Sequence, residues 1–395
     1  MNKKNVIVVG AGPSGLLCAL GLARAGIEVC VVERDSTISN SPRAMVYHWA
    51  VLEGLEQLGV LEDVLEAGFT STQLQFFIFG TGERITLDAG ECLKEVTPHP
   101  YNVHLGQNKL AEIALRHLKT MPNFKIHWST NVSAITQQDD GVTLHCQQEG
   151  EALDLDAGWV VGADGANSSI RKALGLGFEG VTWPERFVAT NLRLDFSQLG
   201  HANATMMLDP EHGAIIARID NEGLWRCTFS ESLELPEESI AERIPAFLAK
   251  ILPAGTEYEL VQFSPYRMHQ RTAESMRVGR VILAGDAAHV TNPTGGLGLT
   301  SGLFDIYVLH EALTAVIEGR ANQDVLDQYS NERRAAFLEQ ASPAATEFKQ
   351  LVFNCSDKTT LEQTLVGLRH LAAHPEQQFA MFGKSRKLQT ASIVK

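Results

Sequence analysis

Residues Asn5–Asp35 read NVIVVGAGPSGLLCALGLARAGIEVCVVERD, and this stretch decides the fold. Its β-branched start predicts a buried strand, the small and apolar residues that follow predict a helix, and a second apolar run predicts another buried strand. Gly10, Gly12 and Gly15 have the G-x-G-x-x-G spacing between the first strand and the helix. This spacing permits a tight turn, close approach of a pyrophosphate, and close packing of helix on strand. Because free N–H groups at a helix N-terminus attract phosphate, the stretch predicts a dinucleotide-binding β-α-β unit.

An acidic residue completes this unit. Glu33 follows the second strand, where its carboxylate can accept both ribose hydroxyls of an adenosine. The residues of the unit that we expect at the cofactor are Gly10, Gly12, Pro13, Ser14, Gly15, Glu33 and Arg34.

Composition narrows the classes of function. The 395 residues suffice for two or three domains, and a net charge of −14 argues against nucleic acid and anionic membranes as partners. The six cysteines form no C-x-x-C pair and are expected to be buried thiols. We find neither a signal-peptide pattern nor an apolar run long enough to span a bilayer. The sequence thus predicts a cytoplasmic protein, a monomer or homodimer, with no metal site.

After the first β-α-β unit, the predicted secondary structure departs twice from the alternation of parallel strands and helices. Leu74–Phe79 and Arg84–Leu87 predict a hairpin foreign to a parallel sheet, and Asp154–Val161 predicts one strand. From Glu185 to Phe263 the pattern gives strands without long helices, apart from a helix at Ser239–Lys250 in which Pro245 is a candidate break. We expect an antiparallel sheet there that forms one wall of a substrate pocket. Helical patterns follow at Leu299–Glu318, Asp324–Phe353 and Thr360–Ala373.

Two further motifs lie downstream. Gly162-Ala163-Asp164-Gly165 follows a predicted strand, and Gly285-Asp286-Ala287-Ala288-His289 follows another, with Pro293 and Gly295-Gly296 shortly after. The three motifs, in this order, resemble those of the group A flavoprotein monooxygenases, the single-component aromatic hydroxylases of the p-hydroxybenzoate hydroxylase type. The resemblance covers roughly residues 5–345.

The resemblance implies an α/β fold with a Rossmann-like FAD-binding domain, an inserted antiparallel β-sheet substrate domain and a helical C-terminal part. We assign residues 1–72, 101–180 and 270–345 to the first, 73–100 and 181–269 to the second, and 346–395 to the third.

The resemblance also implies tight, non-covalent FAD. Asp286 is expected to hydrogen-bond the ribityl chain, and Arg43 and Gln107 to contact FAD. Asp164 is expected to link FAD and NAD(P)H binding, to cap the next helix, or to do both. For Arg43 the alternative is a solvated arginine. The loop Pro293–Gly298 opens a helix whose N-terminus would face the flavin N1–C2=O edge, which adds Gly295, Gly296, Gly298 and Leu299 to the cofactor set. His289 is expected to be structural.

The implied reaction uses NAD(P)H and O2 as transient co-substrates, since no second G-x-G-x-x-G unit is present. Hydride passes to flavin N5, and a flavin C4a-hydroperoxide hydroxylates a small phenolic or N-heteroaromatic ring. Such a site must exclude water and remove a phenol proton with a positioned base.

The sequence identifies the residues that contact the substrate less clearly than those that bind the cofactor. Candidates for catalysis are Tyr47, His48, Arg218 and Pro293, and further candidates for substrate contact are Tyr101, His104, His212, Trp225, Arg226, Tyr266, Arg267 and His269; for each, a surface or core side chain is the competing interpretation. Gly213–Ile219 reads GAIIARI, where only Arg218 could supply the carboxylate clamp of benzoate-type relatives. We therefore expect a mainly apolar pocket.

Two alternatives share the FAD motifs. A flavin-dependent halogenase would carry W-x-W-x-I-P, a pattern that Trp183-Pro184 does not match. An FAD-dependent reductase or a flavin-binding accessory protein would oxidise NAD(P)H without hydroxylating a product.

Overall fold

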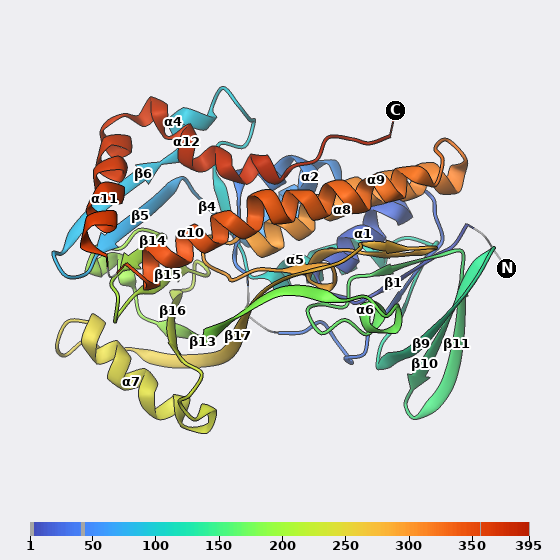
Figure 1. The fold of residues 1–395 in the computed structure, drawn as a ribbon, viewed down its shortest axis with the longest axis horizontal. Coiled ribbons are helices and arrows are strands. Elements are labelled where there is room, and N and C mark those ends of the chain that lie inside the picture. Colours follow the sequence, from blue (N-terminus) through green and yellow to red (C-terminus); the bar gives the residue numbers. More distant parts are fainter. Residues whose placement is uncertain (1–3, 41–43, 356, 395) are drawn as a thin grey trace.

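The structure is a computed structural model that describes residues 4–40, 44–355 and 357–394. Arg43, which we expect at FAD, lies outside the described residues. Figure 1 shows two halves, one built on a parallel sheet and one on a large antiparallel sheet, with the helices α8–α10 running along both. The predicted mixed α/β fold with an antiparallel sheet and C-terminal helices is confirmed.

The parallel sheet has the strand order β18-β19-β12-β1-β2-β8, in which only β18 runs antiparallel. Its strands are β1 (Val6–Val9), β2 (Val29–Val32), β8 (Phe124–His127), β12 (Trp159–Gly162), β18 (Arg277–Val278) and β19 (Val281–Leu283). The predicted β-α-β unit is present, and its strands β1 and β2 are neighbours in this sheet.

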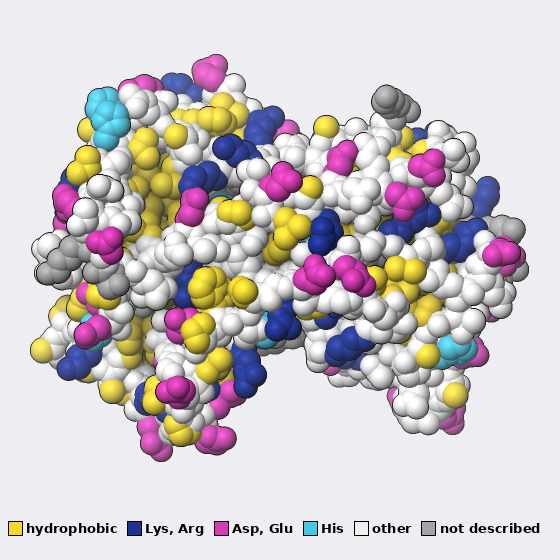
Figure 2. Space-filling view, in the orientation of Figure 1, with side chains coloured by type: hydrophobic (Ala, Val, Ile, Leu, Met, Phe, Trp, Pro, Cys, Tyr) yellow, Lys and Arg dark blue, Asp and Glu magenta, His cyan; other side chains and the backbone are white. Residues whose placement is uncertain are grey.

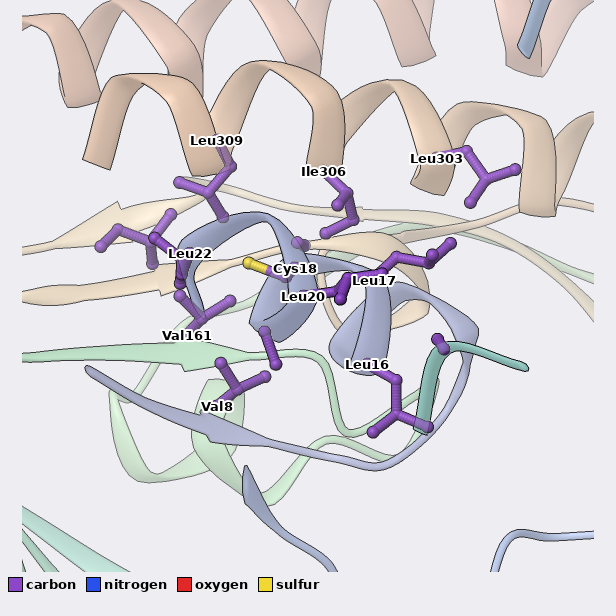
Figure 3. Packing of buried hydrophobic residues seen from close by; sticks show 14 of the residues in the cluster. Val8, Leu16, Leu17, Cys18, Leu20, Leu22, Val161, Leu303, Ile306 and Leu309 are labelled. Carbon is purple, nitrogen blue, oxygen red and sulfur yellow. The ribbon is translucent and has the colours of Figure 1, made fainter. Parts of the chain in front are cut away.

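Helix α1 (Pro13–Arg24) is packed between this sheet and helix α8 (Leu297–Glu318). Figure 3 shows its side chains, among them Leu16 and Cys18, between Val8 of the sheet and Ile306 of α8. A helix covered on two sides is apolar nearly all round, which explains the absence of a polar face in its sequence.

The antiparallel sheet has the order β20-β17-β13-β16-β15-β14-β5-β6, where only β5 and β14 pair in parallel. Its strands are β5 (Gln73–Ile78), β6 (Glu83–Asp88), β13 (Phe178–Arg193), β14 (Ala204–Leu208), β15 (Ala214–Arg218), β16 (Leu224–Ser232), β17 (Glu259–Ala273) and β20 (His289–Val290). Strand β17 was not predicted, because its half-exposed, mostly polar residues lack an apolar alternation.

One face of this sheet is covered by α7 (Ile240–Ile251), which buries Ile240, Ile244 and Leu248. The helix continues through Pro245. This proline is exposed, so the carbonyl that loses its N–H partner lies on the solvent side. The expected break is absent.

The predicted single strand Asp154–Val161 is in fact two strands. β11 (Glu151–Ala157) pairs with β10 (Gly141–Gln148), which pairs with β9 (Thr130–Gln138), whereas β12 joins the parallel sheet. The chain changes sheets at Gly158, whose N–H donates to the Asn5 side chain at 2.9 Å. The burial pattern changes with it, from alternating in β11 to continuous in β12.

The remaining elements connect the two sheets and follow them. They are the strands β3 (Val46–Tyr47), β4 (Phe69–Ser71) and β7 (Asn102–His104), and the helices α2 (Leu52–Gln57), α3 (Leu61–Ala67), α4 (Ala89–Leu93), α5 (Gln107–Leu118), α6 (Ser169–Ala173), α9 (Asp324–Ala336), α10 (Ser342–Phe353), α11 (Lys358–Ala373) and α12 (Phe379–Phe382). Within the described ranges, no helix is both long enough and apolar enough to cross a membrane.

A buried ionic network joins α8, α9 and the last segment. Asp305 accepts hydrogen bonds from Arg333 Nε at 2.8 Å, His289 Nε2 at 2.7 Å and the Gly285 N–H at 2.9 Å. Arg333 Nη1 donates to the Leu388 carbonyl at 2.5 Å. His289 is thus part of the scaffold behind the Gly285–His289 motif, in keeping with its expected structural role.

The charges of the surface are mixed. On the face drawn in Figure 2, acidic and basic side chains alternate over both halves, and the coloured residues there form no basic stripe.

Candidate active site

A cavity of about 740 Å³ lies between the two sheets. One end is lined by the turn after β1 and the loops after β12 and β19, and the other by β14, β15 and β16. Ligands bind outside the carboxyl ends of the strands in open α/β sheets, and the first end is at that position. The cavity is continuous, so a cofactor and a second ligand can meet inside it.

Most of the residues predicted at the cofactor line this cavity together. They are Gly10, Gly12, Pro13, Ser14, Glu33, Arg34, Gln107, Asp164, Asp286, Gly295, Gly296, Gly298 and Leu299, and the catalytic candidates Pro293 and His48 lie there as well. Gly15 is buried beside the turn instead. A Cβ on Gly15 would lie 2.0 Å from the Gly10 carbonyl oxygen, so Gly15 acts through close packing.

The turn after β1 fits a pyrophosphate. A Cβ on Gly12 would meet no atom within 4 Å, so open space adjoins the backbone at the start of α1. Gly12 is the N-cap of α1 and no side chain caps the helix. The first N–H groups of a helix have no intrahelical acceptor, and here they are available to an anion.

Two backbone N–H groups hold the carboxylate of Glu33 in place. Its Oε2 accepts from the Ala11 N–H at 2.6 Å and its Oε1 from the Asp35 N–H at 3.0 Å. Each carboxylate oxygen has a second lone pair, so the group can still accept from ribose hydroxyls.

Asp164 caps helix α6. Its Oδ2 accepts from the backbone N–H groups of Ser169 at 2.7 Å and Ile170 at 3.2 Å, and its Oδ1 from Ser168 Oγ at 2.5 Å. The capping alternative therefore describes its contacts, while a link to NAD(P)H stays a prediction. Arg171 Nη1 of α6 donates to the Ala287 carbonyl at 2.8 Å, which holds two of the motifs together.

The N-terminus of α8 faces the cavity. Its N-cap, Gly296, has φ +69° and Gly295 has φ +90°, a left-handed conformation that glycine adopts without strain. No side chain caps this helix either. With Asp286 exposed at the cavity just after β19, the donors and acceptors of this end fit FAD.

The antiparallel sheet supplies the other wall. Met206, Ile215 and Thr228 are directly opposite one another on neighbouring strands and line the cavity. Ile216 is also a lining residue, but it is 1% exposed and belongs to the core cluster that includes Ile240, Ile244 and Leu248 of α7. The next row on the cavity side contains Ala217 and Arg226.

Arg226, rather than Arg218, is the buried cation of this wall. Arg226 is 4% exposed and its Nε donates to Asn191 Oδ1 at 3.0 Å; burial lowers the pKa of its guanidinium to about 10, with Tyr266 acting in the opposite direction. Arg218 is absent from the described lining residues. Its Nε donates to the Asp220 carbonyl at 2.9 Å and its guanidinium stacks on Phe69. Arg218, the only arginine of Gly213–Ile219, therefore lies outside the described lining, whereas Arg226, another of the candidates for substrate contact, lines the cavity because side chains alternate along β16.

The other candidates divide in the same way. Tyr266, Arg267 and His269 line the cavity, but the described lining omits Tyr101, His104, His212 and Trp225. Tyr47 is packed in the core under the parallel sheet, where burial raises the pKa of its phenol.

Sequence reasoning missed the contribution of the last segment. Phe348, Met381, Phe382, Lys384 and Ser385 line the cavity. The segment is anchored by Trp49 Nε1, which donates to the Phe382 carbonyl at 3.0 Å, and by the Lys384–Glu347 ion pair at 2.9 Å. No motif marks these residues, so only the fold reveals them.

Known proteins agree with this arrangement. Residues 3–342 match the family described as FAD binding domain. The chain is 46% identical over 346 residues to 6-hydroxy-3-succinoylpyridine 3-monooxygenase of Pseudomonas putida, with 87% of this chain and 88% of the relative covered. It is 41% identical over 344 residues to para-nitrophenol 4-monooxygenase of a Pseudomonas species, with 86% and 85% covered.

Solved structures agree as well. The crystal structure of p-nitrophenol 4-monooxygenase from Pseudomonas putida superposes with a TM-score of 0.93 at 38% identity and 98% coverage of both chains. Aklavinone-11 hydroxylase, solved with FAD and aklavinone, superposes with a TM-score of 0.81 at 30% identity, covering 89% of this chain and 70% of that one.

The fold, the cavity and the relatives together define an FAD-binding oxidoreductase whose cavity extends from the predicted cofactor end to the antiparallel sheet. The chain belongs to the group A flavin monooxygenase family and is an FAD-dependent monooxygenase.

Proposed function

We propose that this enzyme uses NAD(P)H and O2 to hydroxylate a small phenolic or N-heteroaromatic ring, with FAD held tightly but non-covalently. The observation that carries the proposal is the continuous cavity, which joins the cofactor end to an apolar sheet wall containing one buried guanidinium. For a ring that carries hydrogen at the oxygenated carbon, the reaction balances as ring–H + O2 + NAD(P)H + H⁺ giving ring–OH + H2O + NAD(P)⁺. In para-nitrophenol that carbon carries the nitro group, which would leave as nitrite, and the balance is para-nitrophenol + O2 + NAD(P)H giving benzoquinone + nitrite + H2O + NAD(P)⁺.

The names of the two relatives support a specific ring position. In 6-hydroxy-3-succinoylpyridine the oxygenated position 3 is para to the hydroxyl, and in para-nitrophenol position 4 is para to the hydroxyl. An ionised hydroxyl raises the electron density of the ring carbon para to it. We infer that this enzyme also oxygenates its ring para to a hydroxyl group.

The protein has three tasks in this reaction. The N-termini of α1 and α8, with Glu33 and Asp286, would hold FAD, which when bound accepts hydride and activates oxygen. Met206 and Ile215 exclude water from the ring. Arg226 provides positive charge on the sheet wall, where an oxyanion or an acidic ring substituent would be stabilised.

A substrate panel tests the proposal. We expect the purified protein to be yellow and to release FAD on denaturation. NADH and NADPH oxidation is measured with para-nitrophenol, 6-hydroxy-3-succinoylpyridine and other para-substituted phenols and hydroxypyridines. Para-nitroanisole, which keeps the nitro group but has no ionisable hydroxyl, is the matched control. At least one para compound should accelerate oxidation strongly and yield a hydroxylated product. Oxidation that produces only hydrogen peroxide with every ring would contradict hydroxylation and favour a reductase.

A further inference from the structure

His48 lies at the junction of the two halves of the molecule. Tyr47 before it belongs to the core under the parallel sheet, and Trp49 after it belongs to the core beside the antiparallel sheet. The Trp49 N–H also donates to Asn102 Oδ1 at 2.9 Å. The backbone is thereby held on both sides, and the His48 side chain opens on the cavity.

The hydrogen bond of His48 fixes which ring nitrogen carries the proton. Nε2 lies 2.8 Å from the Gly295 carbonyl oxygen. Because a carbonyl can only accept, Nε2 must be the donor, and Nδ1 of the neutral ring then carries a lone pair. Across the described residues, Nδ1 has no hydrogen-bond partner.

The surroundings keep this ring neutral near pH 7. Burial lowers the pKa of His48, and the bond to Gly295 opposes that shift only partly. The titratable group next to His48 is His104 on β7. Its Nδ1 bonds to the Arg218 carbonyl, and burial lowers its pKa to about 4. His48 therefore presents a basic nitrogen to the cavity.

Other titratable groups of the cavity are less suited to accept a proton from a ring. The carboxylates of Glu33 and Asp164 already accept N–H and O–H donors at the cofactor end. His269 is the second imidazole in the lining, but its Nδ1 bonds Thr182 Oγ1 at 2.9 Å and it is flanked on β17 by Arg267 and Arg271.

Resting on the proposed function, we propose that His48 is the catalytic base that ionises the substrate. The hydroxyl O–H bond breaks, its proton forms a new N–H bond at Nδ1, and the electron pair stays on the ring as an oxyanion. Nε2 keeps its proton throughout. The resulting imidazolium makes a stronger, charge-assisted bond to Gly295, so the loop that precedes α8 stabilises the charge created on His48.

The test follows the ionisation of a bound ring, without turnover. Para-nitrophenol is the probe, because its phenolate absorbs visible light and its phenol does not. It is bound to the FAD-loaded protein without NAD(P)H and titrated with pH. His48→Gln removes the base but retains an amide N–H that can donate to Gly295, whereas His48→Ala removes both. We expect the bound probe to ionise about one pH unit higher in both variants, which is about tenfold less phenolate at acidic pH.

Two controls make the outcome decisive. His269→Gln makes the same substitution at the other imidazole of the lining, and flavin content and circular dichroism report folding. If the probe ionises in His48→Gln as it does in the parent, but not in His48→Ala, then His48 only anchors the loop that contains Gly295. That result would overturn the proposal. A shift in His269→Gln in place of His48→Gln would overturn it too.

The pH profile of kcat/KM gives a second readout. The parent should lose rate as the pH falls through the lowered pKa of His48, since the protonated ring cannot accept a proton. In His48→Gln the acid limb should move to higher pH, toward the ionisation of the free ring. If the parent enzyme hydroxylates a ring but His48→Gln has the same acid limb as the parent, His48 is not the catalytic base, and the proposed function still stands. A parent that hydroxylates no ring refutes the proposed function itself.

Discussion

Replacing Asp305 by Asn should strongly destabilise the fold. Asp305 and Arg333 are both 0% exposed and their charges are 2.8 Å apart. Burial alone would raise the pKa of the Asp305 carboxyl, but His289 and Arg333 together hold it below its usual value. The substitution keeps the size of the side chain and leaves the Arg333 guanidinium buried without its counter-charge.

The expected loss in free energy of unfolding can be compared with that for an ion pair at the surface. Removing one partner of a buried ion pair costs roughly 3–5 kcal/mol. Arg277 and Asp327 are also 2.8 Å apart, but the Asp327 side chain is 62% exposed, and pairs of that kind contribute about 0.2–1 kcal/mol. We therefore expect Asp305→Asn to lower the free energy of unfolding by roughly 2–4 kcal/mol more than Asp327→Asn does, or about two orders of magnitude in the equilibrium constant.

Urea unfolding followed by far-UV circular dichroism measures this difference. Because the folded pKa of Asp305 is depressed, its contribution is fully present above the unfolded pKa and is lost as the pH falls through the folded value. The difference in free energy of unfolding between Asp305→Asn and Asp327→Asn should therefore become smaller at acidic pH. Equal destabilisation by Asp305→Asn and Asp327→Asn at pH 7 would refute the reasoning.

Further variants test the packing and the cavity. Gly15→Ala should abolish FAD retention because its Cβ would lie 2.0 Å from a carbonyl oxygen, while Gly367→Ala on α11, with no atom within 4 Å, should keep the flavin and raise the free energy of unfolding by up to about 1 kcal/mol. Ile215→Phe should raise KM several-fold and divert NAD(P)H oxidation to hydrogen peroxide, and a parental KM would show that this strand is not the substrate wall. Ile216→Phe should also overpack the core on the α7 side and lower the free energy of unfolding by about 1–3 kcal/mol. Met381→Ala should shift preference toward larger para substituents with unchanged flavin content, and a parental substrate profile would exclude it from the wall.

The cofactor end was predictable because local sequence determines it. A turn such as Gly10–Gly15 requires glycine for steric reasons within a few residues, and each strand before a motif is a buried apolar run. Glu33 and the first residues of α8 line the same cavity. The Gly162–Gly165 motif likewise predicts the contacts of Asp164 with the first N–H groups of α6.

The substrate end depends on pairing between distant strands. Whether Arg218 or Arg226 faces inward follows from the register of β15 against β16, and alternation along one strand does not reveal which face is covered by α7. Met381 and its neighbours carry no pattern at all, because their position comes from contacts with Trp49 and Glu347 on other segments.

The strands of the two sheets alternate along the chain, and this order constrains how the chain folds during its synthesis. β1 needs β12, and β12 needs β19 at Val281–Leu283, so the parallel sheet cannot be completed until the strands β13–β17 have also left the ribosome. β5 likewise waits for β14. Neither half can therefore fold while the other is still being made, and the nascent chain carries unpaired strand edges until about residue 283. Such edges expose a growing chain to aggregation, so protection during translation should matter more for its yield than the stability of the finished enzyme.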